Sequence, residues 1–349
     1  MKPKIRLIIL TLLIYGLPIY IFSVFPFSRK IYPNFETFQS PIFNFLFYGK
    51  AAFSSLGIIF DALLLYCICL LFKKNITLQK ERCWLIYTGL KKIFSFVFIN
   101  KLKNGLTISK EEKISLLFYL VKLFWAPLMI IFALENGRAL YNLLYQYHSW
   151  NFDGINILNF YFPLFISAIF TLDTIIFSSG YLFESPALKN VVKSVEPTAL
   201  GWISALVCYG PFFDTFTRFA GALPQDFADF GSITSNIAAG LLTLILFSVY
   251  VWASVALGFK ASNLTNRGIV SNGPYKYVRH PAYIAKNLGW WLASIPLIKV
   301  FGIITIINLT VWSLVYFVRA LTEERHLMQD EDYVNYAKKV KYMFVPGIF

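Results

Sequence analysis

The chain has 349 residues, of which 57% are hydrophobic and only 14% are charged. Soluble globular proteins carry about 25% charged residues, so this composition excludes a soluble protein and predicts one that crosses a membrane several times. The formal net charge is +14. Because the basic residues lie between apolar stretches, we expect their partner to be anionic lipid headgroups and not nucleic acid.

We predict an all-α, polytopic integral membrane protein with about eight transmembrane helices, including a C-terminal helical hairpin. The basic and apolar N-terminus is similar to a signal peptide, but it has no small-residue cleavage site, so we interpret it as the first span. The seventh span is too short to cross the bilayer by itself, so it is either tilted and extended by its flanks or only partly inserted. The predicted spans are residues 7–26, 53–72, 114–134, 156–180, 198–213, 235–258, 284–295 and 300–318.

The distribution of lysine and arginine predicts how these spans are oriented. Segments on the side of the N-terminus hold 23 of these residues, and the opposite loops hold six. Since basic residues accumulate on the cytoplasmic side, we expect both termini to be cytoplasmic. We expect a bacterial inner membrane because no long targeting segment is present.

Two segments outside the spans carry helix signals. Residues 73–113 mix apolar side chains with lysines, which predicts an amphipathic segment on the cytoplasmic leaflet; a ninth, poor crossing is the alternative. Within this segment, Ser109 and Glu112 form an S-x-x-E capping box, which predicts a helix start. Beyond the last span, residues 322–341 are polar and predict one cytoplasmic helix.

Residues 268–287 (GIVSNGPYKYVRHPAYIAKN) form a polar, aromatic stretch between two apolar segments. Gly273-Pro274 predicts a turn. The tyrosines, together with Arg279 and His280, offer donors and stacking faces for a polar ligand that contains a purine. From composition alone, the favoured interpretation is that these residues anchor the chain at the membrane interface without any chemistry.

A second polar cluster follows the last span. Arg319 and Glu323 lie four positions apart and can pair on one helix face, with Glu324 beside them. This pattern alone is typical of a solvated helix start. The hairpin, however, brings the cluster close to residues 268–287, where carboxylates would suit a positively charged cofactor and Arg or His an anionic group.

The remaining titratable residues carry weaker signals. Asp173, inside the fourth span, is equally compatible with acceptor binding and with a buried pair. His326 is expected to be a solvated helix residue. The four cysteines are scattered and no G-x-G-x-x-G, Walker or H-E-x-x-H motif is present, so no metal is expected.

An ordered string of residues resembles a known family. Gly273-Pro274-Tyr275-Lys276-Tyr277-Val278-Arg279-His280-Pro281-x-Tyr283, then Glu323-Glu324, then Tyr333, Tyr336 and Pro346, is similar to the isoprenylcysteine carboxyl methyltransferase family and its bacterial phospholipid-methyltransferase relatives. The resemblance covers roughly residues 235–349. The string identifies the superfamily specifically but is only weak evidence for the identity of the substrate.

The resemblance implies a methyltransferase that binds S-adenosyl-L-methionine between this loop and the C-terminal helix. It implies catalytic roles for Arg279, Arg319 and Glu324. The cofactor-binding residues that it implies are Gly273, Pro274, Tyr275, Tyr277, Arg279, His280, Pro281, Tyr283, Glu323 and Glu324. The chain departs from the family at Ala285, where Gly is frequent, and at Tyr342 or Met343, where Arg is common.

The resemblance also suggests how the chain is divided. Residues 231–349 would form a methyltransferase-like catalytic region. Residues 1–230 would form an N-terminal membrane scaffold with the basic amphipathic loop. Because this scaffold has no counterpart in small family members, we expect it to supply a substrate vestibule or a dimer surface, so an oligomer is compatible with the sequence.

Physical chemistry independently favours a site at the cytoplasmic interface. The cofactor is charged and cytosolic, whereas removing a lipid-like or isoprenoid acceptor from the bilayer costs about 0.8 kcal/mol per buried CH₂. Arg279 or Arg319 could orient an anionic acceptor. Two alternatives remain open. A sterol-type membrane reductase would bind NADPH and need more clustered Lys and Arg, and a lipid transporter or non-catalytic scaffold would use the basic loops only for headgroups.

Overall fold

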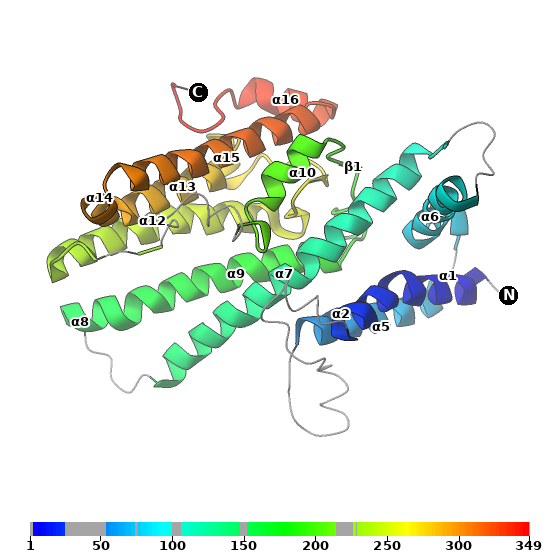
Figure 1. Cartoon of the computed structure of the whole chain (residues 1–349), viewed down its shortest axis with the longest axis horizontal. Helices are drawn as coiled ribbons and strands as arrows, with labels where there is room; N and C mark the ends of the chain where they lie inside the picture. Colours follow the sequence, from blue (N-terminus) through cyan, green and yellow to red (C-terminus); the bar gives the residue numbers. More distant parts are fainter. Residues whose placement is uncertain are drawn as a thin grey trace. The chain divides into compact units, whose positions relative to one another are not determined.

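The computed structural model describes residues 3–24, 54–73, 76–99, 106–146, 152–213, 226–227 and 229–348. This part of the chain is mostly helical, with only two two-residue strands (Figure 1), which confirms the predicted all-α class. It forms two compact units. The first unit comprises the described residues within 1–131 and 192–195, and the second comprises those within 132–191 and 196–349. The predicted functional division near residue 230 stays a prediction.

Six helical segments in the described ranges are long and apolar enough to cross a membrane, and each overlaps a predicted span. A multi-pass membrane protein is therefore supported, but the predicted count of eight is not confirmed. The six segments are Pro3–Phe22, Ser55–Phe72, Lys110–Tyr145, Gly154–Leu182, Ile233–Lys260 and Ile303–Leu327.

The two predicted spans that are missing from this set are built from short helices. In the fifth, α10 (Ala199–Leu206) has only eight residues before the chain enters turns. In the seventh, α13 (Pro281–Ala293) ends at Ser294 and a separate short helix, α14 (Ile295–Phe301), follows it.

The first unit packs its helices around a small apolar cluster. The cluster consists of Leu7, Ile14, Leu70, Cys83 and Ile86. The elements of this unit are α1 (Pro3–Thr11), a π-helical turn (Leu12–Gly16), α2 (Leu17–Val24), α5 (Ser55–Phe72), a 3₁₀ turn (Leu78–Lys80), α6 (Arg82–Ile99), β1 (Ser194–Val195) and the first part of α7 (Lys110–Gln146).

Two predictions about residues 73–113 can be compared with this unit. The capping box is confirmed, because the Ser109 N–H donates to the Glu112 carboxylate (2.9 Å) and the Glu112 N–H donates to the Ser109 hydroxyl (3.2 Å). The segment contains the helix α6, which exposes Phe94 and Phe98. Its position on the cytoplasmic leaflet stays a prediction.

The second unit holds the remaining elements, including the C-terminal helical hairpin (Figure 1). The hairpin consists of α13 and α14 on one arm and α15 on the other. The elements of this unit are the rest of α7, α8 (Gly154–Asn156), a π-helical turn (Ile157–Tyr161), α9 (Phe162–Leu182), α10, α12 (Ile233–Leu257), a 3₁₀ turn (Gly258–Lys260), β2 (Thr265–Asn266), a second 3₁₀ turn (Gly273–Lys276), α13, α14, α15 (Ile303–Leu327) and α16 (Glu331–Lys339).

One end of the second unit gathers the ends of four helices. Arg267, which follows β2 in the segment after α12, donates to the Gly180 carbonyl in the last turn of α9 (2.6 Å). Arg279, just before α13, contacts Glu324 in the last turn of α15 (2.7 Å). Arg267 also donates to the Asn190 carbonyl (3.5 Å), so the polar segments that follow α9, α12 and α15 meet at one end of this unit. That this end faces the cytoplasm stays a prediction.

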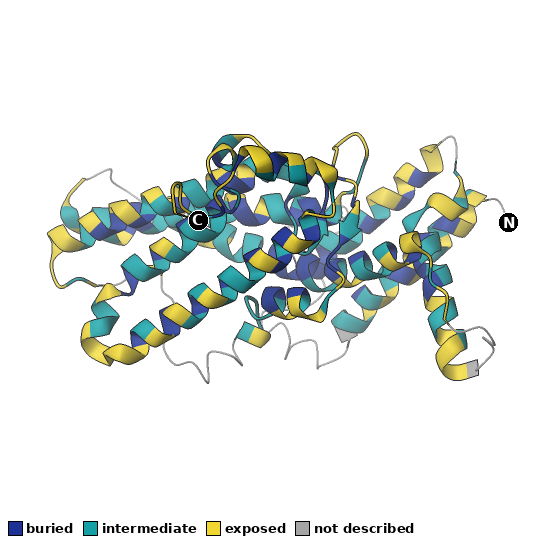
Figure 2. Ribbon diagram, turned by 90° about the horizontal axis from the view of Figure 1, so that it is seen from above, coloured by how far each residue is buried: buried dark blue, intermediate teal, exposed yellow. Residues whose placement is uncertain are grey.

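The side chains of the second unit are sorted as expected for helices in lipid. Figure 2 shows exposed residues on the outer faces of the long helices and buried residues on their inner faces. Large apolar residues on an outer face suit contact with acyl chains, where they have no energetic reason to turn inward. On α12 and α15 these exposed residues include Leu241, Leu242, Ile245, Ile303, Ile307 and Leu314.

Asp173 is explained by packing between helices. The carboxylate lies on α9 and is 5% exposed. It accepts hydrogen bonds from the Tyr250 hydroxyl (2.6 Å) and the Ser254 hydroxyl (2.5 Å), both on α12. A buried charge needs such partners. Of the two possibilities, the structure displays the buried, hydrogen-bonded one.

The predicted single helix over residues 322–341 is wrong in one respect. The helix α15 continues out of the apolar region to Leu327 and ends, and α16 begins separately at Glu331. Asp330 causes the break, because its carboxylate accepts the Asp332 N–H (3.1 Å) and so caps the start of α16. The acidic run Asp330-Glu331-Asp332 is a helix-start signal that the sequence contained.

Candidate functional site

The loop between α12 and α13 is held in one conformation by its own backbone and by the C-terminal tail. Gly273 has φ +58°, a conformation that favours glycine, and it opens the 3₁₀ turn at the predicted Gly273-Pro274 turn. The Arg279 N–H donates to the Tyr342 carbonyl (3.0 Å), and the His280 N–H donates to the Met343 carbonyl (2.9 Å). Tyr342 and Met343, where the resemblance leads us to expect an Arg, thus support the loop through backbone atoms.

Glu324 joins the loop, α15 and α16 through one oxygen. Its Oε1 lies 2.7 Å from Arg279 Nε and 3.0 Å from His280 Nε2, and it accepts the Tyr333 hydroxyl at 2.7 Å. Burial, followed by the charge of Glu324, raises the pKa of Tyr333, so the phenol stays protonated and keeps donating. Arg279 also donates to the carbonyls of Val340 (3.0 Å) and Lys341 (2.7 Å). Arg279 and Glu324 together lock this end of the unit.

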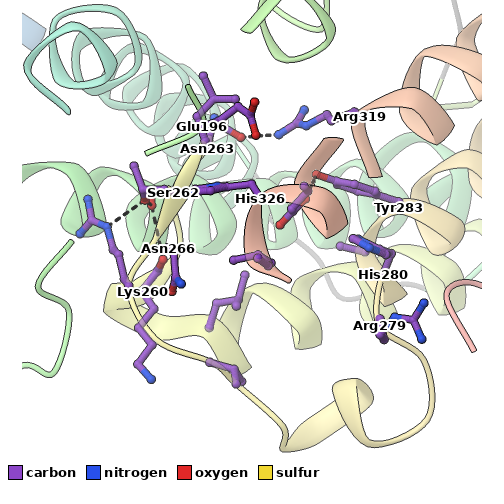
Figure 3. A pocket seen from close by; sticks show the side chains of 18 of the residues that line it. Glu196, Lys260, Ser262, Asn263, Asn266, Arg279, His280, Tyr283, Arg319 and His326 are labelled. Atoms are coloured by element: carbon purple, nitrogen blue, oxygen red, sulfur yellow. Dashed lines mark hydrogen bonds between the residues drawn. The ribbon is translucent and has the colours of Figure 1, made fainter. Parts of the chain in front are cut away.

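A second face of α15 lines a cavity, which Figure 3 shows from close by. The residues on this face recur at helical spacing, so their side chains lie one above the other. Glu324 is one position away from Glu323 and lies outside this row. The row consists of Tyr316, Arg319, Thr322, Glu323, His326 and Leu327.

The sequence suggested that Arg319 and Glu323 pair with each other, but both make their main contacts with other residues. The Arg319 guanidinium donates to the side-chain oxygen of Asn263 and lies 5.3 Å from the Tyr283 ring centre. The Glu323 carboxylate instead accepts the Tyr283 hydroxyl (2.7 Å). Tyr283 therefore connects the first turn of α13 to both charged residues on α15.

The structure brings many of the sequence-predicted site residues to this cavity, but not all of them. The predicted residues in its wall are Tyr275, Arg279, His280, Tyr283, Arg319 and Glu323. Among the described residues that form the wall, Gly273, Pro274, Tyr277, Pro281 and Glu324 are not present. Gly273 and Pro274 form the turn, Pro281 begins α13, and Tyr277 is 64% exposed.

Several wall residues were not predicted from the sequence. His326, expected to be solvated, is only 3% exposed and lies in the cavity wall (Figure 3). Its spacing of seven residues from Arg319 is the signal that could have revealed it. Glu196 and Asn263 also line the cavity and carry no such signal, because they come from segments outside the hairpin. Ala285 is buried but is not among the described wall residues, so it does not narrow the cavity.

The cavity wall contains more basic residues than the sequence suggested. They are Lys260, Arg267, Arg279, Lys286 and Arg319. Protein groups already engage these cations. Arg279 pairs with Glu324, and the Lys286 ammonium lies 5.1 Å from the ring centres of both Tyr250 and Trp290. Two carboxylates, from Glu196 and Glu323, share the same wall. The cavity can therefore accept groups of either charge.

A comparison with known families places this arrangement. Residues 237–329 match the Isoprenylcysteine carboxyl methyltransferase (ICMT) family. The match confirms the predicted resemblance for the C-terminal region and supports a membrane methyltransferase in general. It includes the loop from Gly273 to Tyr283 and the pair Glu323-Glu324. No curated protein and no solved structure matches the chain.

The ICMT match is shorter than the cavity wall. It ends at residue 329, whereas Tyr333 and Tyr336, which also line the cavity, lie on α16. Tyr336 donates its hydroxyl to the Tyr275 carbonyl (2.8 Å) and so supports the ICMT-like loop from outside the match. At the other end, Glu196 lies about forty residues before residue 237, where the match begins. The site of this chain is thus an ICMT-like centre completed by residues on both sides of it.

Proposed function

We propose that the chain is an S-adenosylmethionine-dependent methyltransferase that acts on a lipid-like or isoprenoid acceptor at the membrane interface. One observation carries the proposal: the two ICMT-like segments, the loop before α13 and the end of α15, line one cavity. They lie far apart in the sequence, but Tyr283 and Glu323 meet at 2.7 Å across the cavity wall.

The residues in the wall fit a charged methyl donor. When bound, this donor supplies an activated methyl group on a positively charged sulfur. The carboxylate of Glu323 provides a nearby negative charge, and Tyr275 and Tyr283 provide aromatic faces that attract cations. Burial and the neighbouring Glu323 raise the pKa of Tyr275, so this ring stays neutral. The wall residues would hold and align the donor, while the loop excludes water.

The two arginines differ in what they can do for an acceptor. The Arg279 guanidinium already contacts Glu324 and donates to two backbone carbonyls, which favours a role in supporting the loop and not in binding the acceptor. Arg319 lies in the wall beside Tyr283 and Tyr316, and it follows most of the exposed apolar residues of α15 along the helix. We therefore assign the orientation of an anionic acceptor group to Arg319. An acceptor that stays in the bilayer avoids the cost of moving its chains into water.

A ligand-stabilisation experiment tests the donor. The purified full-length chain in detergent is heated alone, with S-adenosylhomocysteine and with NADPH, and its unfolding is followed. We expect stabilisation by S-adenosylhomocysteine, because a ligand that binds only the folded state adds about 2.7 kcal/mol at one hundred times its Kd. NADPH is the right competitor because five basic residues line the cavity. Stabilisation by NADPH alone would replace the proposal with a reductase.

A further inference from the structure

Glu196 presents a buried carboxylate to the cavity from outside the ICMT-like segment. The residue is 2% exposed and belongs to the cavity wall, near Asn263 and Arg319 (Figure 3). It lies at position 196, whereas the family match begins at residue 237. A charge at this depth is costly unless each oxygen has a partner. The partners of its two oxygens are therefore informative.

All the side-chain hydrogen bonds of Glu196 are made by one of its two carboxylate oxygens. Its Oε1 accepts the Thr198 N–H (3.0 Å), the Thr198 hydroxyl (2.5 Å) and Nη2 of Arg325 (2.7 Å). Its Oε2 is fully buried, and no described residue gives it a hydrogen bond. Arg325 balances the charge through Oε1 but leaves Oε2 without a donor. A buried oxygen of this kind points to a ligand that donates a hydrogen bond.

The protein holds this carboxylate rigidly. The Glu196 N–H donates to the Leu264 carbonyl (2.8 Å), and the Trp202 indole N–H donates to the Glu196 carbonyl (2.8 Å). Gly201, in the first turn of α10, allows the close approach, because a Cβ at this position would lie 2.3 Å from Cγ of Glu196. The side chain is thus fixed before any ligand arrives, which lowers the cost of binding.

We propose that Glu196 Oε2 accepts a hydrogen bond from an O–H or N–H group of the methyl donor. This inference rests on the proposed function and adds a donor contact that the ICMT-like segment does not contain. S-adenosylmethionine carries such donors on two parts: the nucleoside has the ribose hydroxyls and the adenine amino group, and the amino-acid part has the ammonium. All of these are N–H or O–H donors that a fixed carboxylate oxygen recognises.

The test is equilibrium binding to the full-length chain in detergent with Glu196→Gln. Because Oε1 has three donors around it, the amide oxygen takes that position and the amide NH₂ replaces Oε2. A donor then faces a donor. We expect S-adenosylhomocysteine to bind about tenfold more weakly or worse, with little change in the unfolding temperature of the free protein. The matched control is Glu331→Gln, which removes the same charge from the exposed start of α16.

A second ligand separates the two parts of the donor. Methylthioadenosine keeps the ribose but lacks the amino-acid part. Equal weakening of both ligands assigns the contact to the nucleoside part, with its ribose hydroxyls and adenine amino group, and weakening of S-adenosylhomocysteine alone assigns it to the ammonium; either result supports the proposal. If Glu196→Gln does not fold, Glu196→Asp gives the same readout, because it keeps the charge but withdraws the carboxylate.

The outcomes distinguish this inference from the proposed function. Wild-type affinity in the folded variant overturns the role of Glu196 and leaves the methyltransferase proposal intact. If the wild-type chain binds no S-adenosylhomocysteine, both are overturned.

Discussion

Replacing Glu324 with alanine is expected to destabilise the protein by about 3–5 kcal/mol, because the change leaves Arg279 as an uncompensated, partly buried charge. His280 and Tyr333 lose their shared partner in the same step. The loop before α13 then loses its anchor to α15, so binding of S-adenosylhomocysteine should be lost as well. The measurements are thermal unfolding in detergent and equilibrium binding of S-adenosylhomocysteine.

Glu331→Ala is the matched control for this variant. It removes a carboxylate from the exposed first turn of α16, only seven positions away, without touching the loop. We expect it to resemble the wild type in both measurements. A Glu324→Ala protein with wild-type stability and wild-type affinity would show that Glu324 does not join the loop to α15 in the way described.

Replacing Arg319 with lysine is expected to slow methyl transfer by about 10²-fold. Lysine keeps the charge but not the planar guanidinium, which stacks on tyrosine rings and bonds to Asn263. The loss of orientation should appear in turnover, since a misplacement of about 1 Å can cost this much in rate. Affinity for S-adenosylhomocysteine should change far less. Transfer of labelled methyl groups into a membrane lipid extract measures the turnover.

Arg6→Lys provides a control of the same chemistry. The Arg6 guanidinium also lies over an aromatic ring, 4.6 Å from the centre of Trp84, but it belongs to the first unit. We expect unchanged turnover in that variant. Equal turnover in Arg319→Lys and the wild type would remove Arg319 from acceptor orientation.

The sequence predicted the parts of the site that lie in continuous patterns. The turn at Gly273-Pro274 and the polar end of α15 both follow from local residue types, whereas the span predicted from residue 284 begins as α13 at Pro281. The proximity of Tyr283 and Glu323 followed from the hairpin, because two antiparallel helices bring these ends together. Local signals and a short connection were sufficient for this half of the cavity.

The other half of the cavity could not be predicted from local sequence patterns. Glu196 and Asn263 enter the wall from segments whose only sequence signal is polarity, and their positions depend on contacts with Leu264 and Tyr181. His326 differs from these two residues, because its helical spacing from Arg319 places both side chains on the same face of α15. The single helix predicted over residues 322–341 was wrong because the cap at Asp330 outweighs the helix-forming residues on either side of it.

The most direct test of the central claim follows amide hydrogen exchange with and without S-adenosylhomocysteine. If the loop before α13 and the end of α15 form one donor site, then peptides covering residues 268–283 and 319–327 should both gain protection on adding this ligand, and NADPH should produce neither change. Protection of only one segment, or of neither while the ligand is bound, would contradict a shared site.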